Sequence, residues 1–320
     1  MTIPLAHIDL LSAGSTTLAE SLDRACRRTG LFYIHGHGVD PGLFERLERE
    51  SRAFFALPLD RKLAIRMERG GRAWRGYFPV GAELTSGKPD RKEGIYFGAE
   101  LAENHPRVRD GTPLHGANLF PDLPGFRATV LEYMDRMTAV GQVVLRCIAQ
   151  SLGLEPGTFV DHITRDPLVL FRIFNYPPAS VADDQGVGEH TDYGLLTLLW
   201  QDAAGLQVKP DAVWIDVPPI PGALICNLGD MLERLSGGVY RSAPHRVRSP
   251  LNRGRLAFPF FLDPGFDVEL RPLISPVAGA NKGPERWDGE SVHAFQGTYG
   301  EYLLRKVARV FPDLGREVLD

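Results

Sequence analysis

Residues 168–178 read LVLFRIFNYPP, and they open a series of short apolar segments that turns separate. The segments that follow, up to residue 264, read LLTLLWQD, GLQVKP, VWIDVPP, GALICNLGD, VYRSAPHRV and RLAFPFFLDP. Short segments of this kind and spacing are typical of strands in an antiparallel sandwich or barrel. We therefore expect a mainly β core within residues 166–270.

Helical patterns flank this core. Apolar residues recur at helical spacing over residues 17–29, 41–58 and 124–152, and again in the tail from residue 293. The candidate buried positions of the longest helix are Val130, Met134, Met137, Val144 and Ile148. The expected organisation is one compact unit: a helix and strand region over 1–120, a long-helix region over 121–165, the β core over 166–270 and a helical region over 271–320.

The composition excludes several classes of protein. The chain has 320 residues, a formal net charge of −4 and 43% hydrophobic residues, so nothing indicates a nucleic-acid partner. No apolar run reaches the roughly 18 residues of a membrane span, and the first residues lack a secretory pattern. The three cysteines share no CxxC spacing, which favours a reducing compartment such as the cytoplasm. A small molecule is therefore the expected binding partner, and the sequence does not indicate an oligomeric state.

One set of polar residues stands out in the β region. His190 and Asp192 lie two apart in GEHTDYGLL, so they share a face if this stretch enters a strand. His245 follows 53 positions later in another expected strand. Two histidines and a carboxylate form the ligand set of non-haem Fe(II) oxygenases, and the same set can hold catalytic zinc. Histidines satisfied within a turn or the sheet are the alternative that needs no metal.

Arg255 lies ten positions after His245, in NRGRLAFPFFLDP. An arginine that faces a core needs an anionic partner. That partner is either one of the chain's own acids or the carboxylate of a ligand, which suits a bidentate guanidinium. An oxygenase with a dicarboxylate co-substrate needs such an arginine, whereas a zinc hydrolase does not.

These residues resemble a known pattern. HTD at 190–192, His245 and Arg255 are similar to the HxD…H…RxS pattern of the 2-oxoglutarate and Fe(II)-dependent dioxygenases, and nearest to their isopenicillin N synthase-like branch. Further pieces spread over most of the chain are IPLAHIDL, FYIHGHGV, FFALP, RGYFPVGAELTSGKPD, FNYPP, NLGDMLERLSGG, FFLDP and TYGEYL. GAELTSGKPD with GEHTDYGLL also resembles the bacterial ethylene-forming members of the family.

The resemblance implies a distorted double-stranded β-helix, a cupin-like jelly roll with flanking helices. It implies Fe(II) at His190, Asp192 and His245, with 2-oxoglutarate and O2 as co-substrates. Arg255 and Tyr176 would bind the distal carboxylate of 2-oxoglutarate. The implied reaction is oxidation, foremost hydroxylation, of an unactivated C–H bond in a small molecule such as an amino acid or a product of secondary metabolism, with release of succinate and CO2.

Ala257 departs from the family pattern, which has serine there. Residue 257 shares the face of Arg255, so the missing hydroxyl would have contacted the distal carboxylate. One such hydrogen bond is worth about 1 kcal/mol or more. We therefore expect 2-oxoglutarate to bind about tenfold more weakly than with serine.

Five further residues are candidates for substrate contact. Tyr193 follows Asp192 directly, and Arg172 and Phe174 share the strand face of Tyr176. Glu83 and Thr85 belong to a segment that would reach the iron if it folds over the barrel mouth, where loops commonly set specificity.

Three alternative functions remain open at this point. An oxidase of the isopenicillin N synthase type would use the same iron without 2-oxoglutarate, and Arg255 with Ala257 would then anchor a substrate carboxylate. A zinc hydrolase would need a general base, and Glu189 would point away from His190. A non-catalytic jelly-roll binding protein would have little reason to keep an open coordination face. Metal content and 2-oxoglutarate turnover separate these readings.

Overall fold

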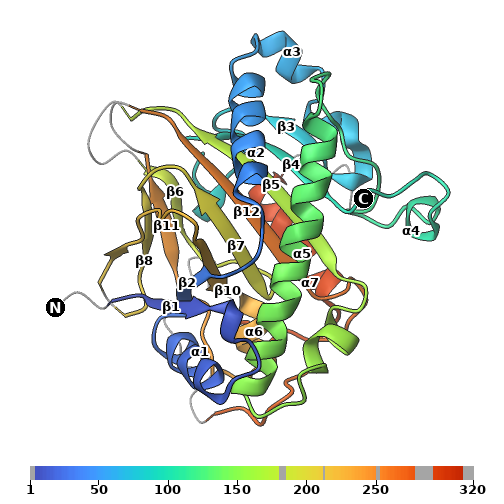
Figure 1. The fold of residues 1–320 in the computed structure, drawn as a ribbon. Helices are drawn as coiled ribbons and strands as arrows, with labels where there is room; N and C mark the ends of the chain where they lie inside the picture. The colour runs from blue at the N-terminus through green and yellow to red at the C-terminus, as the bar shows by residue number, and fades with distance from the viewer. Residues whose placement is uncertain (1–3, 180–184, 212, 250–252, 278–290, 313–320) are drawn as a thin grey trace.

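Two β-sheets form the centre of the protein in the computed structural model, which describes residues 4–179, 185–211, 213–249, 253–277 and 291–312 (Figure 1). The large sheet has the spatial order β1 (Ala6–Asp9), β2 (Leu31–His35), β10 (Leu224–Leu228), β7 (Leu196–Gln201), β12 (Arg255–Asp263), β5 (Leu168–Tyr176), β4 (Glu93–Gly98) and β3 (Gly76–Phe78). The small sheet has the order β6 (Gln185–His190), β11 (His245–Arg248), β8 (Leu206–Val208) and β9 (Ile215–Asp216). Apart from the parallel pair β1–β2, the paired strands described are antiparallel.

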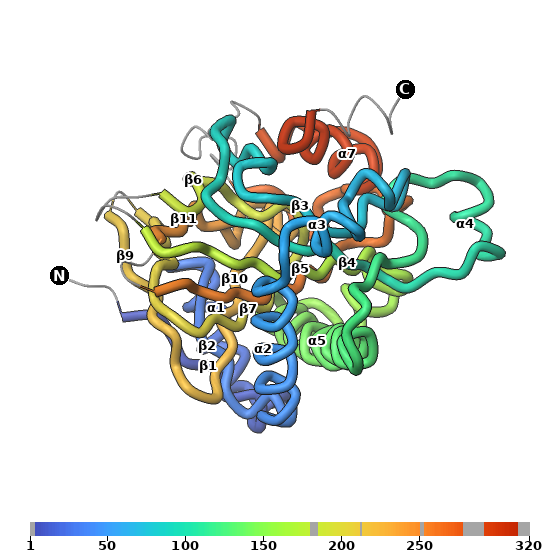
Figure 2. The backbone as a smooth tube through the Cα atoms, turned by 90° about the horizontal axis from the view of Figure 1, so that it is seen from above, coloured from blue at the N-terminus to red at the C-terminus, as the bar shows by residue number. Residues whose placement is uncertain are grey.

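Helices cover the large sheet from both sides. The helices of the described residues are α1 (Thr16–Arg28), α2 (Pro41–Phe55), α3 (Leu59–Leu63), α4 (Pro106–Arg109), α5 (Phe126–Ser151), α6 (Asp230–Leu235) and α7 (Tyr299–Val310), and α4 lies in a loop that projects away from the sheet (Figure 1). Short helical turns occupy Leu10–Ser12, Met67–Ala73, Thr85–Gly87 and Thr158–Ile163. Figure 2 shows α1, α2 and α5 on one side of the large sheet and α7 on the other, the side on which β6 and β11 lie. None of the described helices is long and apolar enough to cross a membrane.

The apolar patterns of the sequence explain this packing. Leu18, Leu22 and Cys26 form the buried stripe of α1, and Ser15 caps its first turn by accepting from the Leu18 N–H. The five candidate positions of the long helix are all buried in α5. Gly141 lets α5 approach β12, because a Cβ there would come within 2.7 Å of Leu262 Cδ2. The apolar segments expected between 166 and 270 form β5 and the strands β7 to β12.

Three local expectations were incomplete. Residues 70–123 are rich in Gly and Pro, and we predicted no individual element there, but they contain β3 and β4. All six residues of β4 are buried, so polar alternation is absent from that strand. The C-terminal helix begins only at Tyr299. His190 ends β6, whereas Asp192 lies in the turn before β7, so strand alternation is not what brings the two together.

Candidate metal centre and active-site cavity

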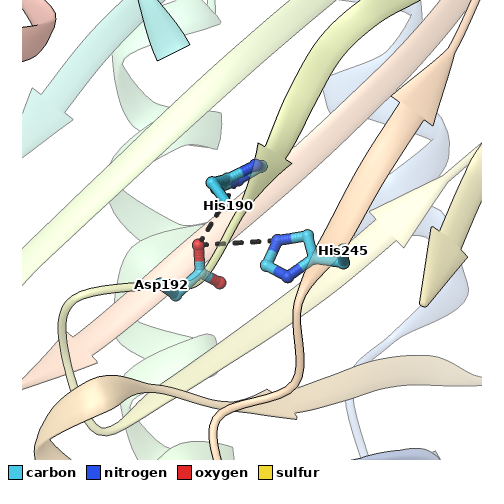
Figure 3. Close-up of side chains that lie close together, drawn as sticks. All are labelled: His190, Asp192 and His245. Carbon is cyan, nitrogen blue, oxygen red and sulfur yellow. Dashed lines mark ion pairs between the residues drawn. The ribbon is translucent and has the colours of Figure 1, made fainter. Parts of the chain in front are cut away.

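Three side chains predicted as metal ligands converge on one point (Figure 3). Asp192 Oδ1 lies 3.9 Å from His190 Nε2 and 3.7 Å from His245 Nε2. The centroids of the two imidazole rings are 4.3 Å apart. All three potential ligand atoms lie within 4.8 Å of one another, a spacing that a single metal ion can bridge.

Strand pairing is what places the histidines together. His190 at the end of β6 and His245 at the start of β11 are direct partners in the antiparallel register of the small sheet. Their Nδ1 atoms lie 2.8 Å from the Gly188 carbonyl oxygen and 3.1 Å from the Ala243 carbonyl oxygen. A carbonyl only accepts, so each Nδ1 carries the proton and each Nε2 keeps a lone pair for a metal.

Asp192 is held by two side chains of the large sheet. Its Oδ2 accepts from the Thr197 hydroxyl of β7 and, over 2.6 Å, from Asn227 Nδ2 of β10. The other oxygen, Oδ1, therefore faces the histidines. Although burial acts to raise it, the pKa of Asp192 is lowered, because His245, His190 and the two hydrogen bonds stabilise the carboxylate. Burial, followed by the proximity of His245, lowers the pKa of His190 to about 4.

The donor set fits Fe(II). Two imidazoles and one carboxylate direct lone pairs at the same point, and a cation between them would be stabilised by all three. Ligands on one face of the ion leave positions for co-substrate and O2. His190, Asp192 and His245 are all largely buried, which restricts water at the centre.

A cavity of about 130 Å³ extends from these three residues between the two sheets. Alternate residues of β12 line it from Arg255 to Asp263, and so do Leu170, Arg172, Phe174 and Tyr176 of β5. Tyr193, Glu83 and Thr85 also line the cavity. The structure therefore brings together all of the site residues expected from the sequence, including Ala257.

Arg255 is one of the residues that line the cavity. Its side chain is buried, with Nη2 donating to Gln201 Oε1 over 2.6 Å and Nε donating to the Ala203 carbonyl over 3.2 Å. The guanidinium carbon lies 4.7 Å from the ring centre of Tyr176, and Nη1 has no partner. Both hydrogen-bond acceptors are neutral. The guanidinium is thus ready for an anionic ligand, as 2-oxoglutarate binding requires.

Charged groups of both signs also line the cavity. Glu83 Oε2 is 2.7 Å from Lys92 Nζ, and Glu83 Oε1 accepts from the Tyr96 hydroxyl. Arg172 stacks on the Tyr96 ring at 3.5 Å. Although burial acts to raise it, the pKa of Glu83 is lowered, because Lys92 and Arg172 favour the carboxylate. Glu83 is therefore ionised at neutral pH.

Several residues of the site had not been expected from the sequence. Asn227 and Thr197 hold Asp192, while Lys92 and Tyr96 hold Glu83. Asn227 did carry a signal, since it is a polar residue in the middle of the apolar strand LICNL. Leu303, Val307 and Val310 of α7 and the adjacent Phe311 add an apolar roof that no local pattern indicated.

Comparison with known proteins agrees with this geometry. A family model described as the 2OG-Fe(II) oxygenase superfamily matches residues 166–264, and one described as non-haem dioxygenase in morphine synthesis N-terminal matches residues 3–123. A probable iron/ascorbate oxidoreductase of Dictyostelium discoideum is 46% identical, over 94% of this chain and 91% of its own. The chain therefore belongs to the 2OG-Fe(II) oxygenase superfamily, in its isopenicillin N synthase-like branch, and is an oxidoreductase of the 2-oxoglutarate and Fe(II)-dependent dioxygenase family.

Other relatives have different named activities. A homoarginine-6-hydroxylase of Arabidopsis thaliana is 37% identical over 94% of this chain and 84% of its own. A 1-aminocyclopropane-1-carboxylate oxidase of Dictyostelium mucoroides is 37% identical over 92% and 90%. Among solved structures, Neurospora crassa T7H in complex with alpha-KG and 5-formyluracil has a TM-score of 0.76 at 27% identity, covering 95% of this chain and 96% of its own. Membership of this family makes the zinc hydrolase and the non-catalytic binding protein untenable.

Proposed function

We propose that this dioxygenase hydroxylates an unactivated C–H bond of a free amino acid with a basic side chain, while 2-oxoglutarate is converted to succinate and CO2. The observation that carries the proposal is the layout of a single cavity. It contains the unpartnered Arg255 Nη1, the cluster of three potential metal ligands, and the charged groups Glu83 and Arg172. The similarity to a homoarginine-6-hydroxylase supports an amino-acid substrate.

The metal ligands in this proposal are His190 and His245 through Nε2 and Asp192 through Oδ1. Bound iron supplies oxygen activation, with 2-oxoglutarate as the reductant. Thr197 and Asn227 keep the Asp192 carboxylate ionised and turned toward the histidines. This second layer of hydrogen bonds fixes the geometry that the metal needs.

Arg255 and Tyr176 orient the co-substrate. Arg255 Nη1 would donate to the distal carboxylate, and Tyr176 would hold the guanidinium plane by stacking at 4.7 Å. Ala257 leaves one side of that carboxylate without a hydroxyl donor. Binding of 2-oxoglutarate therefore rests on the arginine and tyrosine.

The substrate would pair with the charged groups of the same cavity. Glu83 would accept from the cationic end of the amino acid, and Arg172 would receive its carboxylate. Thr85, Phe174 and Tyr193 complete the candidate contact surface, since all three line the cavity. The apolar side chains of α7 exclude water from the reacting C–H bond.

Succinate formation tests this function. The iron-loaded enzyme is supplied with 2-oxoglutarate and with L-homoarginine, L-arginine or their neutral analogue L-citrulline. We expect the basic amino acids to stimulate succinate formation and to gain one oxygen atom, and citrulline to have little effect. The absence of succinate with every amino acid at saturating 2-oxoglutarate would contradict the proposal.

A 2-oxoglutarate-independent oxidase is the second candidate. Ala257 in place of the family serine and the similarity to a 1-aminocyclopropane-1-carboxylate oxidase favour it. Arg255 would then anchor the carboxylate of the substrate itself. O2 uptake that needs substrate and iron but no 2-oxoglutarate identifies this alternative in the same assay.

The proposed location is the cytoplasm. Cys26, Cys147 and Cys226 are all buried and free, and burial raises the pKa of each thiol. Free buried thiols are typical of proteins from a reducing compartment. Cell fractionation with a tagged full-length chain tests this assignment, and recovery in an extracellular or periplasmic fraction would contradict it.

A further inference from the structure

Helix α7 forms the apolar roof of the cavity. Leu303, Val307 and Val310 of this helix line the cavity, on the side of the large sheet opposite α2 and α5 (Figure 2). A capping box of Thr298 and Glu301 fixes the first turn of the helix. The position of α7 therefore determines the shape of the roof.

Two buried tyrosines attach the start of this roof to aspartates. The Tyr299 hydroxyl donates to Asp263 Oδ2 over 2.5 Å, and the Tyr302 hydroxyl donates to Asp230 Oδ2 over 2.8 Å. None of these four side chains is more than 3% exposed. Buried carboxyl groups are costly unless they are hydrogen-bonded, so both pairs are specific attachments.

Both aspartates also contact the segment that carries Asp192. The Asp230 N–H donates to the Asp192 carbonyl over 2.8 Å. Asp263 Oδ1 occupies the space beside Gly194, where an added Cβ would lie only 1.4 Å from that oxygen. The Tyr302–Asp230 pair thus connects α7 to the backbone of Asp192, and the Tyr299–Asp263 pair connects α7 to Gly194, two positions after Asp192.

The far end of α7 contacts the other functional segment of the cavity. The Val310 carbonyl accepts from the Leu84 N–H over 3.1 Å, and Leu84 lies between Glu83 and Thr85. One helix is therefore connected at its start, through Asp230 and Asp263, to the metal-ligand segment, and it bonds directly at its end to the segment with candidate substrate groups.

We infer that Tyr299 and Tyr302 are positioning residues for the metal ligand Asp192, acting through Asp263 and Asp230. Through these two pairs, the packing of α7 over the cavity sets how the Asp192 carboxylate meets the metal. The inference rests on the assigned metal centre and holds whichever compound is the substrate.

Tyr299→Phe and Tyr302→Phe test this role, because each removes one hydroxyl and leaves the ring. Tyr240→Phe is the matched control. Tyr240 is fully buried, donates to Asp23 Oδ1 over 2.8 Å and is not among the cavity-lining residues. Each of the three variants loses a tyrosine–aspartate hydrogen bond, and Tyr240→Phe also loses a 2.8 Å contact with the Ser151 hydroxyl. We therefore expect Tyr240→Phe to lower Tm at least as much as the two test variants.

Two measurements distinguish a role of the tyrosines in positioning Asp192 from a purely structural role in holding α7 in place. The first is the Fe(II) dissociation constant, and the second is the visible spectrum of the anaerobic complex of enzyme, Fe(II) and 2-oxoglutarate. We expect Tyr299→Phe and Tyr302→Phe to weaken Fe(II) binding by roughly three- to tenfold, less than the ~10–100-fold typical of a direct partner of a ligand. We also expect both to shift the visible band, with Tyr240→Phe unchanged in both measurements.

Fe(II) affinity and a spectrum equal to those of Tyr240→Phe in both variants would overturn the inference and leave the two tyrosines as structural anchors. Should Tyr299→Phe fail to fold, Tyr302→Phe decides alone, because its aspartate bonds directly to the Asp192 carbonyl. The Fe(II) dissociation constant requires neither 2-oxoglutarate nor an amino-acid substrate, so this measurement decides the inference even if the proposed function fails.

Discussion

Asn227 Nδ2 donates to Asp192 Oδ2 over 2.6 Å. Asn227 lies in β10 of the large sheet, 35 residues after Asp192 in the sequence. This bond turns the free oxygen of the carboxylate toward the two histidines. It also shows that the metal centre draws on the large sheet as well as on the small sheet.

Asn227→Ala removes this bond, and we expect Fe(II) affinity to fall by about 10–100-fold, as for other groups that orient a metal ligand. Fe(II) titration of metal-free protein measures the loss. The control is Asn118→Ala, since Asn118 is a buried asparagine bonded to Arg75 and Gly98. Equal Fe(II) affinity in the two variants would contradict the assigned role of Asn227.

Ala257→Ser restores the hydroxyl of the family pattern on the cavity face of β12. We expect 2-oxoglutarate to bind about tenfold more tightly, since one added hydrogen bond to a carboxylate is worth about 1.4 kcal/mol. The anaerobic band of the iron complex, titrated with 2-oxoglutarate, gives the dissociation constant. An unchanged constant would mean that the distal carboxylate does not lie beside residue 257. Ala149→Ser, in the buried face of α5, controls for the serine itself.

Glu83→Gln tests the proposed contact between Glu83 and the cationic group of the substrate. The change keeps the shape of the side chain and removes its charge, so we expect KM for a basic amino acid to rise by about tenfold or more. The dissociation constant of 2-oxoglutarate should stay unchanged. Glu100→Gln is the control, because Glu100 bonds to Asn118 and Arg127 and is not among the cavity-lining residues. A similar KM in both variants would remove Glu83 from substrate recognition.

Asp263 makes stability depend on pH. Burial raises the pKa of its carboxyl to about 7. The folded protein therefore holds this proton more tightly than the unfolded chain, whose aspartates titrate near pH 4. The resulting stabilisation is complete below about pH 4 and is lost as the pH rises to about 7. It amounts to at most about 4 kcal/mol, at about 1.4 kcal/mol per pKa unit.

Asp263→Asn removes this titration. We expect Tm of the metal-free wild type to fall relative to the variant between about pH 4 and about pH 7. Thermal melts of both proteins at each pH give the difference. If the two Tm curves run parallel across this range, the Asp263 carboxyl does not titrate within it.

The sequence predicts the β core and the main helices because short-range periodicity encodes them. The candidate metal ligands His190, Asp192 and His245 were also predictable, because together with Arg255 they keep the spacing of a known pattern. Strand β4 lacked such a signal, since burial on both faces removes the polar alternation. Polar partners distant in sequence were the harder part: the Tyr299–Asp263 contact depends on how α7 packs, which no local pattern specifies.

Two of the candidate iron ligands belong to the small sheet, and the third precedes β7 of the large sheet. Bound iron would therefore act as a cross-link that joins the two halves of the jelly roll. A ligand that binds only the folded state stabilises it by about 2.7 kcal/mol at a hundred times its Kd. For this enzyme, scarcity of iron would thus shorten the lifetime of the polypeptide as well as stop its catalysis.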